Sequence, residues 1–267
     1  MTERTSLGDR AERALRAYLR QAPFAAAIWR SNEATALAQV PLPRPTLDIG
    51  CGFGEFGRIF VGDGPPIDVG IDIDRSELFA ARDAPYRALI QCDARRIPLD
   101  SGTFASVFSI STLEHIPDVE RAFTEAARVL RPGGVLAFTV PLARLTDNFL
   151  GGRALRLVSA RAARWYADRV NRMLTHVNVW PAERWISLVE GAGLRVEETR
   201  THISPAATMA FELLLPAAYA SRKFKDVTGR RIPHPDLAVR AIEPLARRLV
   251  TPEADGGSNL LVVARKP

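Results

Sequence analysis

Cysteine is scarce in this sequence: of its 267 residues, two are cysteines, Cys51 and Cys92. So few cysteines exclude a disulfide-stapled scaffold and fit a reducing cytoplasm. Neither cysteine belongs to a Cys/His spacing that is typical of a metal centre. We therefore expect no metal site.

Long hydrophobic runs are absent as well. The most apolar stretch, Ala206–Ala220, contains Glu212 and Pro216 and is too short to span a bilayer. The N-terminal residues lack the basic start, apolar run and small-residue cleavage site of a signal peptide. We expect a cytoplasmic protein, for which peripheral contact with a membrane surface stays open.

The composition is that of an ordinary globular protein, with 47% hydrophobic and 25% charged residues. Its net charge of +6 is unevenly distributed: residues 46–142 carry −5, whereas residues 1–45, 143–184 and 185–267 carry +3, +5 and +3. An acidic body is thus flanked by arginine-rich additions. Solvated helix faces are the simplest explanation, and attraction of an anionic acceptor or membrane surface is the alternative.

The most informative stretch is 46–57, Thr-Leu-Asp-Ile-Gly-Cys-Gly-Phe-Gly-Glu-Phe-Gly. A strand, a glycine turn and a helix suit a nucleotide-type ligand, because glycine lets the backbone approach closely and a helix N-terminus offers unpaired N–H groups. Gly52, Gly54 and Gly57 spell G-x-G-x-x-G, and Asp72 follows twenty residues after Gly52. This spacing is typical of a dinucleotide site, so an NAD-dependent oxidoreductase is one interpretation.

Asp48 favours another interpretation. Read from Asp48, the stretch is D-x-G-x-G-x-G, with a carboxylate two residues before Gly50. A carboxylate there repels a pyrophosphate but attracts the ammonium group of an amino-acid ligand. The stretch resembles motif I of the class I S-adenosylmethionine-dependent methyltransferases.

Strands and helices alternate from Thr46 onward, as in βαβ units with a parallel sheet. Besides the strand at 46–49, we expect strands at 67–72, 88–92, 104–110, 135–140 and 258–264, and a helix at 118–130.

Three carboxylates fall near the ends of the first three strands, where open α/β sheets bind ligands. They would repel one another unless a ligand divides them, and S-adenosylmethionine offers an ammonium group, a ribose diol and an adenine amine. We expect Asp48 near the ammonium group, Asp72 at the ribose and Asp93 at the adenine amine. The alternative for each aspartate is a helix cap or turn.

Later segments make the resemblance specific. Residues 91–94, 113–118 (Leu-Glu-His-Ile-Pro-Asp), 127–134 (Ala-Arg-Val-Leu-Arg-Pro-Gly-Gly) and 181–194 resemble, in order and spacing, motifs of the UbiE-like, type 11 methyltransferases. The resemblance implies an α/β, Rossmann-like fold: a seven-stranded, mostly parallel sheet with helices on both faces and an antiparallel last strand. It also implies S-adenosylmethionine as the cofactor. The cofactor-binding residues are then expected to be Asp48, Gly50, Cys51, Gly52, Gly54, Asp72, Ile73, Asp93, Ala94 and Ser109.

The resemblance covers only part of the chain, and the remainder suggests additions to the core. We expect an N-terminal helical cover (1–45), the cofactor-binding core (46–142), a helical insertion that could act as a lid (143–180), a core helix and strand (181–204), a C-terminal helical insertion (205–256) and the final strand (257–267).

Each insertion has more than one interpretation. In 143–180, an apolar stripe at helical spacing is expected to pack on the domain and leave its arginines in water, with a lid or a lipid-binding surface as alternatives. The stripe consists of Leu155, Val158, Ala162, Trp165 and Tyr166. In 205–256, the apolar run Phe211–Leu215 precedes Arg222, Lys223 and Lys225. That segment is read as extra core, a homodimer contact or a membrane-surface element.

Methyl transfer from a sulfonium needs an aligned acceptor and, for a hydroxyl or an acidic carbon, removal of a proton. His115 is the candidate general base because imidazole titrates near neutrality; ordering of its loop is the alternative. Glu114 is expected to be structural. Trp165, Tyr166, His176 and Trp180 are candidate acceptor contacts, with packing as the alternative for each.

We expect an O- or C-methyltransferase acting on a small-molecule or lipid-linked acceptor, for which an anionic compound is one option, with no specific nucleic-acid partner. The alternatives are the NAD-dependent oxidoreductase and a non-catalytic protein of the same fold that serves as a binding partner.

Overall fold

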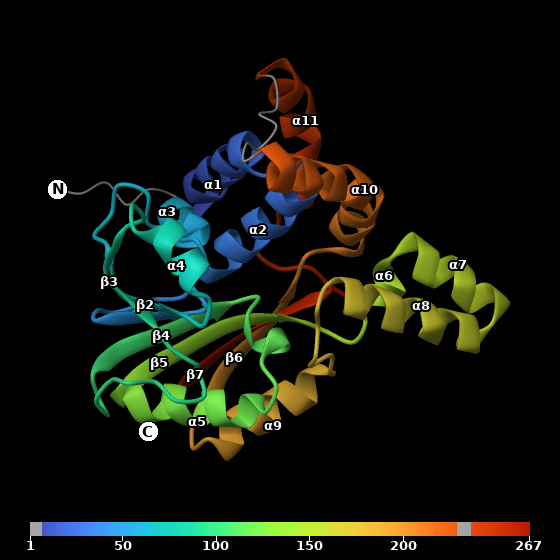
Figure 1. The fold of residues 1–267 in the computed structure, drawn as a ribbon. Helices are drawn as coiled ribbons and strands as arrows, with labels where there is room; N and C mark the ends of the chain where they lie inside the picture. The colour runs from blue at the N-terminus through green and yellow to red at the C-terminus, as the bar shows by residue number, and fades with distance from the viewer. Residues whose placement is uncertain (1–6, 229–235) are drawn as a thin grey trace. The chain divides into compact units, whose positions relative to one another are not determined.

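Seven strands form one sheet in the computed structural model, which describes residues 7–228 and 236–267. The strand order is β3-β2-β1-β4-β5-β7-β6 (Figure 1). Strands β1 to β5 pair in parallel, and β7 runs antiparallel to β5. The strands are β1 (Thr46–Ile49), β2 (Ile67–Asp72), β3 (Tyr86–Gln91), β4 (Phe104–Ile110), β5 (Leu130–Pro141), β6 (Arg195–His202) and β7 (Asn259–Arg265). The predicted fold is confirmed.

Eleven α-helices and one short 3-10 helix, η1, accompany the sheet within the described ranges. They are α1 (Leu7–Gln21), α2 (Phe24–Leu37), α3 (Glu55–Val61), α4 (Arg75–Ala81), η1 (Leu113–His115), α5 (Val119–Val129), α6 (Leu145–Asn148), α7 (Leu150–Val158), α8 (Ala160–Met173), α9 (Ala182–Gly191), α10 (Pro205–Thr228) and α11 (Asp236–Leu249).

Two predicted strands, β3 and β5, begin at least two residues earlier than expected, and β7 is displaced by one residue from the predicted 258–264. β3 begins at Tyr86 and ends at Gln91, so Cys92 lies beyond it. β5 begins at Leu130 and therefore includes the segment Arg131–Gly134, which the sequence presents as a turn before the strand. The reason is pairing: the Gly133 N–H donates to the Lys266 carbonyl, and the Lys266 N–H donates to the Gly134 carbonyl, each at 2.9 Å.

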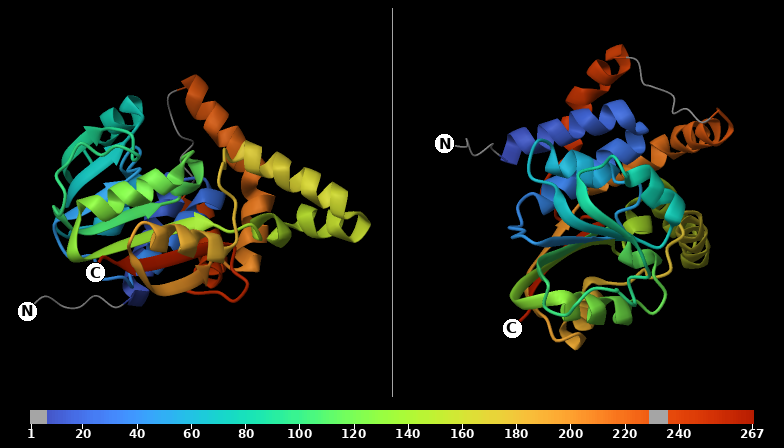
Figure 2. Two further views of the ribbon diagram at one scale, coloured as in Figure 1. Left: turned by 90° about the horizontal axis from the view of Figure 1, so that it is seen from below. Right: turned by 60° about the vertical axis from the view of Figure 1, so that its left-hand side comes forward.

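Helices cover both faces of the sheet (Figures 1 and 2). α5 and α9 lie side by side on one face, where the rings of Phe123, Phe138 and Trp185 meet with centroids 5.2–6.3 Å apart. On the other face, Phe56 and Phe60 of α3 pack against Phe108 of β4. All seven residues of β4 are buried because the strand is central in the sheet and covered on both faces.

The chain divides into two compact units. The sheet unit comprises Val40–Ala143, Asp168–Arg200 and Asn259–Pro267. The helical unit comprises Met1–Gln39, Arg144–Ala167 and Thr201–Ser258. The six-segment organisation expected from the sequence stays a prediction.

Helices from distant parts of the sequence hold the helical unit together. α1 packs on α2 and α11, and α2 packs on α10. The buried amide of Asn32 in α2 donates to the Leu249 carbonyl at 3.0 Å and accepts from the Thr251 N–H at 3.0 Å. The ring of Trp29 contacts that of Phe211 at 4.7 Å. The N-terminal helices are thus tied to the C-terminal insertion.

The apolar stripe expected in 143–180 packs only in part: Leu155, Ala162 and Tyr166 are half-buried, whereas Val158 and Trp165 are exposed. Along α7 and α8, the buried residues are Gly152 and Val170. Val158 is 80% exposed and Trp165 is 62% exposed. α7 and α8 form a hairpin, and the apolar side chains on its outer side do not pack against a hydrophobic core.

Two expectations concern other parts of the chain. The side chains of Arg222, Lys223 and Lys225 lie outside the described residues, so their basic cluster stays a prediction. None of the helices in the described ranges combines the length and the apolar character needed to cross a bilayer.

Candidate active site

The glycine turn after β1 is fixed by its neighbours in the sheet. The N–H groups of Gly50 and Cys51 both donate to the Ile71 carbonyl, at 2.8 and 3.0 Å. Gly50 has φ +78°, and a Cβ there would lie 2.2 Å from the Thr112 side chain, so no larger residue fits. A Cβ on Gly52 would meet nothing closer than 3.8 Å. The turn therefore presents open backbone at Gly52.

Asp72 is joined to that turn directly. One carboxylate oxygen accepts from the Gly52 N–H at 2.8 Å, and the other accepts from the Asp74 N–H at 2.9 Å. A carboxylate oxygen has more than one acceptor position, so Asp72 can still accept from a diol. The neighbouring Ile73 is 65% exposed and offers an apolar surface beside it. Asp72, Ile73 and Gly52 are thus brought together as the sequence predicts, whereas their contact with a cofactor stays a prediction.

Asp48 is buried in β1, and its partner is a residue that the sequence analysis missed. The Tyr86 hydroxyl donates to the Asp48 carboxylate at 2.6 Å. A Cβ on Gly57 would lie 2.2 Å from the Tyr86 hydroxyl, and one on Gly70 would lie 2.8 Å from the Tyr86 ring. The last glycine of G-x-G-x-x-G therefore makes room for the tyrosine. Because a buried carboxylate in a strand needs a hydrogen-bond donor, Asp48 itself was the signal in the sequence that such a partner exists.

Asp93 is paired with Arg95. The Arg95 guanidinium donates to both oxygens of Asp93 at 2.7–3.0 Å, and the Arg95 N–H adds a bond of 2.9 Å. These hydrogen bonds hold the pKa of the Asp93 carboxyl below its usual range. Asp93 and the half-buried Ala94 follow β3 as expected, and the predicted contact of Asp93 with an adenine amine would have to be shared with Arg95.

Ser109 and Cys51 face inward. The buried Ser109 hydroxyl donates to the Ile49 carbonyl at 2.9 Å, which joins β4 to the end of β1. Cys51 is also buried, and its burial raises the pKa of the thiol well above the ordinary value. Burial likewise raises the pKa of Cys92 to about 11. Both sulfurs stay protonated near neutrality, and the Cys51 sulfur lies close to Gly70 of β2, where an added Cβ would be 3.0 Å from it.

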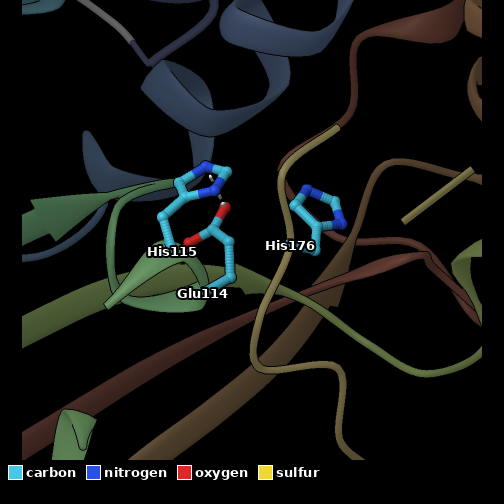
Figure 3. A group of neighbouring side chains, drawn as sticks. All are labelled: Glu114, His115 and His176. Atoms are coloured by element: carbon cyan, nitrogen blue, oxygen red, sulfur yellow. Dashed lines mark ion pairs between the residues drawn. The ribbon is translucent and has the colours of Figure 1, made fainter. Parts of the chain in front are cut away.

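His115 and His176 come together, which the sequence did not predict (Figure 3). Their ring centroids are 5.4 Å apart. The loop that carries His176 is fixed to η1, because the N–H groups of Val177 and Asn178 donate to the Glu114 carbonyl at 2.8 and 2.9 Å. The Asn178 amide also donates to the carbonyls of Leu113 and Ile116.

The hydrogen bonds of His115 determine which nitrogen is basic. Its Nδ1 lies 2.9 Å from the Thr175 carbonyl, which can only accept, so Nδ1 carries the proton. Nε2 then has the free lone pair and lies 3.8 Å from the carboxylate of the buried Glu114. Burial, together with the nearby His115, lowers the pKa of His176 to about 4. Glu114 and the neutral ring of His176 therefore flank the His115 ring, and the His115 side chain is 37% exposed.

These three residues form a group that could hold a metal ion, since one potential ligand atom from each lies within 4.8 Å of the others. Ligands bonded at about 2.0–2.2 Å around one ion stand roughly 3–3.5 Å apart. Glu114 and His115 Nε2 stand 3.8 Å apart, which is wider, so these two side chains would have to move closer together to share one ion. The expected absence of a metal stays a prediction.

The remaining candidate acceptor contacts are divided between the units. Trp180 belongs to the sheet unit and packs against the buried Trp185 with ring centroids 4.9 Å apart, which supports its packing interpretation. Trp165 and Tyr166 belong to the helical unit. The Tyr166 hydroxyl donates to Glu212. Burial, and to a smaller extent this hydrogen bond, raises the pKa of Tyr166.

Two features define the Rossmann-like methyltransferase class. The antiparallel β7 lies between β5 and β6 in the sheet, and the glycine turn after β1 is hydrogen-bonded to an aspartate at the end of β2. Open backbone at Gly52 and carboxylates at three neighbouring strand ends fit the donor and acceptor groups of S-adenosylmethionine. Comparison with known proteins carries the assignment further. Residues 47–138 match the family model described as a methyltransferase domain.

Two relatives support this match. Trans-aconitate 2-methyltransferase of Azoarcus sp. is 32% identical over 77% of this chain and 90% of its own length. Methyltransferase GfsG of Streptomyces halstedii is 30% identical over 64% of this chain and 62% of its own length, so the chain spans less than two thirds of that relative. The chain belongs to the class I S-adenosylmethionine-dependent methyltransferases, of the UbiE-like type, and S-adenosylmethionine is its cofactor.

Solved structures agree on the fold. The [4+2]-cyclase SpnF superposes with a TM-score of 0.61 at 20% identity, covering 93% of this chain and 85% of its own. A SAM-dependent methyltransferase from Thermotoga maritima, described as a possible histamine N-methyltransferase, gives 0.55 at 17% identity, with 89% of each chain covered. Because one of these proteins is named a cyclase, the fold alone does not fix the reaction.

Proposed function

We propose that this methyltransferase acts on an oxygen or carbon atom of a small-molecule or lipid-linked acceptor, and that His115 takes the proton of the acceptor. Relatives with small or carrier-linked acceptors support the substrate class. Besides the trans-aconitate enzyme, they include malonyl-[acyl-carrier protein] O-methyltransferase of Enterobacter lignolyticus, 34% identical over 41% of this chain and 45% of its own length.

The observation that carries the proposal is the setting of the His115 ring. The Thr175 carbonyl keeps the proton on Nδ1 and leaves Nε2 as the basic nitrogen. When Nε2 takes a proton, the Glu114 carboxylate 3.8 Å away stabilises the imidazolium that forms. His176 stays neutral beside it, because burial keeps its pKa near 4, and therefore adds no opposing charge.

Residues of the sheet unit would hold the cofactor, which supplies the electrophilic methyl group when bound. Asp72 would accept from the ribose hydroxyls, with Ile73 beside it. Asp93 and Ala94 would lie at the adenine. Asp48 would favour the methionine ammonium group, and the Tyr86 hydroxyl would hold its carboxylate in place.

The cofactor assignment is tested by calorimetry with S-adenosylmethionine, S-adenosylhomocysteine and NAD. Binding of the two sulfur compounds without NAD supports these contacts. Binding of NAD alone would favour the oxidoreductase alternative. Binding of S-adenosylmethionine without turnover of any acceptor in a broad panel would favour the non-catalytic alternative.

The role of His115 is tested by the pH dependence of turnover. With an acceptor found in a panel of hydroxyl, enol and carboxyl compounds, His115→Asn should lower kcat by about 10²–10⁴-fold and remove the acidic limb of the pH profile. Cofactor affinity should be unchanged, and Glu114→Gln should lower kcat less. The control is His176→Asn, which should keep the limb. Retention of both rate and limb by His115→Asn would show that His115 only orders its loop.

Other partner assignments remain predictions. A homodimer, an anionic acceptor and a cytoplasmic location are expectations from the sequence, and sedimentation analysis of the purified protein tests the first. Peripheral contact with a membrane is likewise an expectation, and it would depend on the arginine-rich insertion.

A further inference from the structure

The α7–α8 hairpin concentrates positive charge. Residues 150–167 contain four arginines, Arg153, Arg156, Arg161 and Arg164, and no acidic residue. Of the four, Arg156 pairs with Asp147. The other three are exposed and have no ion pair among the described residues. The end of the hairpin therefore keeps most of its charge available.

The same end exposes apolar side chains. Leu157 is 91% exposed and Val158 is 80% exposed, and both lie where α7 ends and the chain turns through Ser159 into α8. The two helices run side by side away from this turn (Figures 1 and 2). Trp165, 62% exposed, lies five residues into α8, which is about 8 Å along the helix axis.

The opposite end of the hairpin is fixed. The Glu212 carboxylate of α10 accepts from the N–H groups of Leu150 and Gly151, at 2.5 and 3.1 Å, and from the Tyr166 hydroxyl. Gly151 lies against the Tyr166 ring, which brings the two helices close together there. The hairpin is thus anchored at its base, and its tip (residues 153–165) is left to solvent.

We propose that the tip of the α7–α8 hairpin docks on an anionic lipid surface. Leu157 and Val158 enter the interface between headgroups and acyl chains, and Trp165 lies at the level of the headgroups. Arg153, Arg161 and Arg164 contact the lipid phosphates. This proposal depends neither on the acceptor nor on the role of His115.

The order of side chains along the hairpin favours a bilayer over an acidic protein. Apolar side chains occupy the end, arginines flank them, and the aromatic ring lies further back. This spatial order of side-chain types matches the depth profile of a membrane interface, where apolar groups lie deepest and aromatic rings and cationic groups lie nearer to the water. A protein partner requires no such order.

The test is sedimentation with vesicles of phosphatidylcholine, with and without about one third phosphatidylglycerol. The full-length protein should bind the anionic vesicles, and about 1 M salt should release it by screening the charges. Replacing Arg153, Arg161 and Arg164 by glutamine should weaken binding by about 100-fold, at about fivefold per arginine. Leu157→Ser with Val158→Ser should weaken it by about tenfold.

The matched control replaces three exposed arginines elsewhere, Arg13, Arg20 and Arg131, by glutamine, and should bind nearly as well as the parent. Circular dichroism verifies that each variant is folded. Anionic vesicles should also shift the tryptophan emission to shorter wavelength, and Trp165→Phe should lose most of this shift. Equal binding by the hairpin and control variants, or binding to neither vesicle, would overturn the proposal. Binding to a purified acyl carrier protein but not to the vesicles would overturn it in favour of an acidic protein partner.

Discussion

The sheet unit and the helical unit differ in what their side chains do. In the sheet unit, every residue of β4 is buried, and charged groups such as Asp72 and Asp93 have defined partners. In the helical unit, α7 buries Gly152, and α7 and the part of α8 up to Ala167 present arginines and apolar side chains to solvent. This difference supports the two proposals, that the sheet unit holds the cofactor and that the helical unit offers a surface to a partner.

The largest effect is expected where the sheet unit is most tightly packed. Gly57→Ala places a Cβ 2.2 Å from the Tyr86 hydroxyl, so the tyrosine must leave Asp48 or α3 must move. We expect unfolding free energy to fall by about 2–4 kcal/mol, measured by denaturant titration. Gly191→Ala is the control, because a Cβ there meets nothing within 4 Å. Equal stability of the two variants would contradict the packing role of Gly57.

The second effect concerns the cofactor alone. Asp72→Ala removes the acceptor of the Gly52 N–H and the predicted acceptor of the ribose hydroxyls. The affinity for S-adenosylmethionine should fall by about 1.5–3 kcal/mol in titration calorimetry. Asp83→Ala, at a carboxylate that is 79% exposed, should bind normally. Unchanged affinity in Asp72→Ala would reject the ribose assignment.

The third effect should stay within the helical unit. Glu212→Ala removes the acceptor for Leu150, Gly151 and Tyr166 and should loosen the base of the hairpin by about 1–3 kcal/mol. Hydrogen exchange should accelerate over residues 145–167, with cofactor affinity unchanged. Glu190→Ala, an exposed position on α9, serves as the control. Faster exchange throughout the sheet unit would show that the two units do not respond separately.

The smallest effect is the pH dependence from His176. Its folded pKa of about 4 lies below the ordinary 6.5, so the unfolded chain binds more protons between these values. The contribution of His176 to the unfolding free energy is therefore fully present above about pH 6.5 and is lost as the pH falls towards 4. We expect a loss of only about 1–2 kcal/mol, since the ring is partly exposed to solvent. His176→Gln should flatten this slope, and NMR titration measures the pKa directly. A measured value near 6.5 would contradict the prediction.

Periodic patterns and motifs predict the sheet well. The expected strands at 67–72 and 104–110 have the observed bounds, because their apolar runs lie in a buried sheet. The pairing of Gly133 and Gly134 with Lys266 could not be predicted, since it joins residues far apart in the chain. For the same reason, Tyr86 escaped notice although Asp48 and Gly57 were both recognised.

The helical unit was predicted less well. The apolar stripe of 143–180 predicts a buried face, but amphipathicity does not specify what covers that face, and Val158 and Trp165 are exposed. Likewise, His115 and His176 were each recognised as chemically capable. Their proximity depends on a loop held by Asn178, for which local sequence gives no signal.

The position of β7 has a consequence for synthesis of the protein on the ribosome. β7 lies between β5 and β6 in the sheet, although it follows every other strand along the chain. While the nascent chain is still emerging, β5 can pair with β4, but its other edge has no partner and β6 has no place to attach. An open, hydrophobic strand edge is prone to aggregation. We expect that a chain stalled before residue 259 would be a client for chaperones, even though the whole glycine turn had already been made.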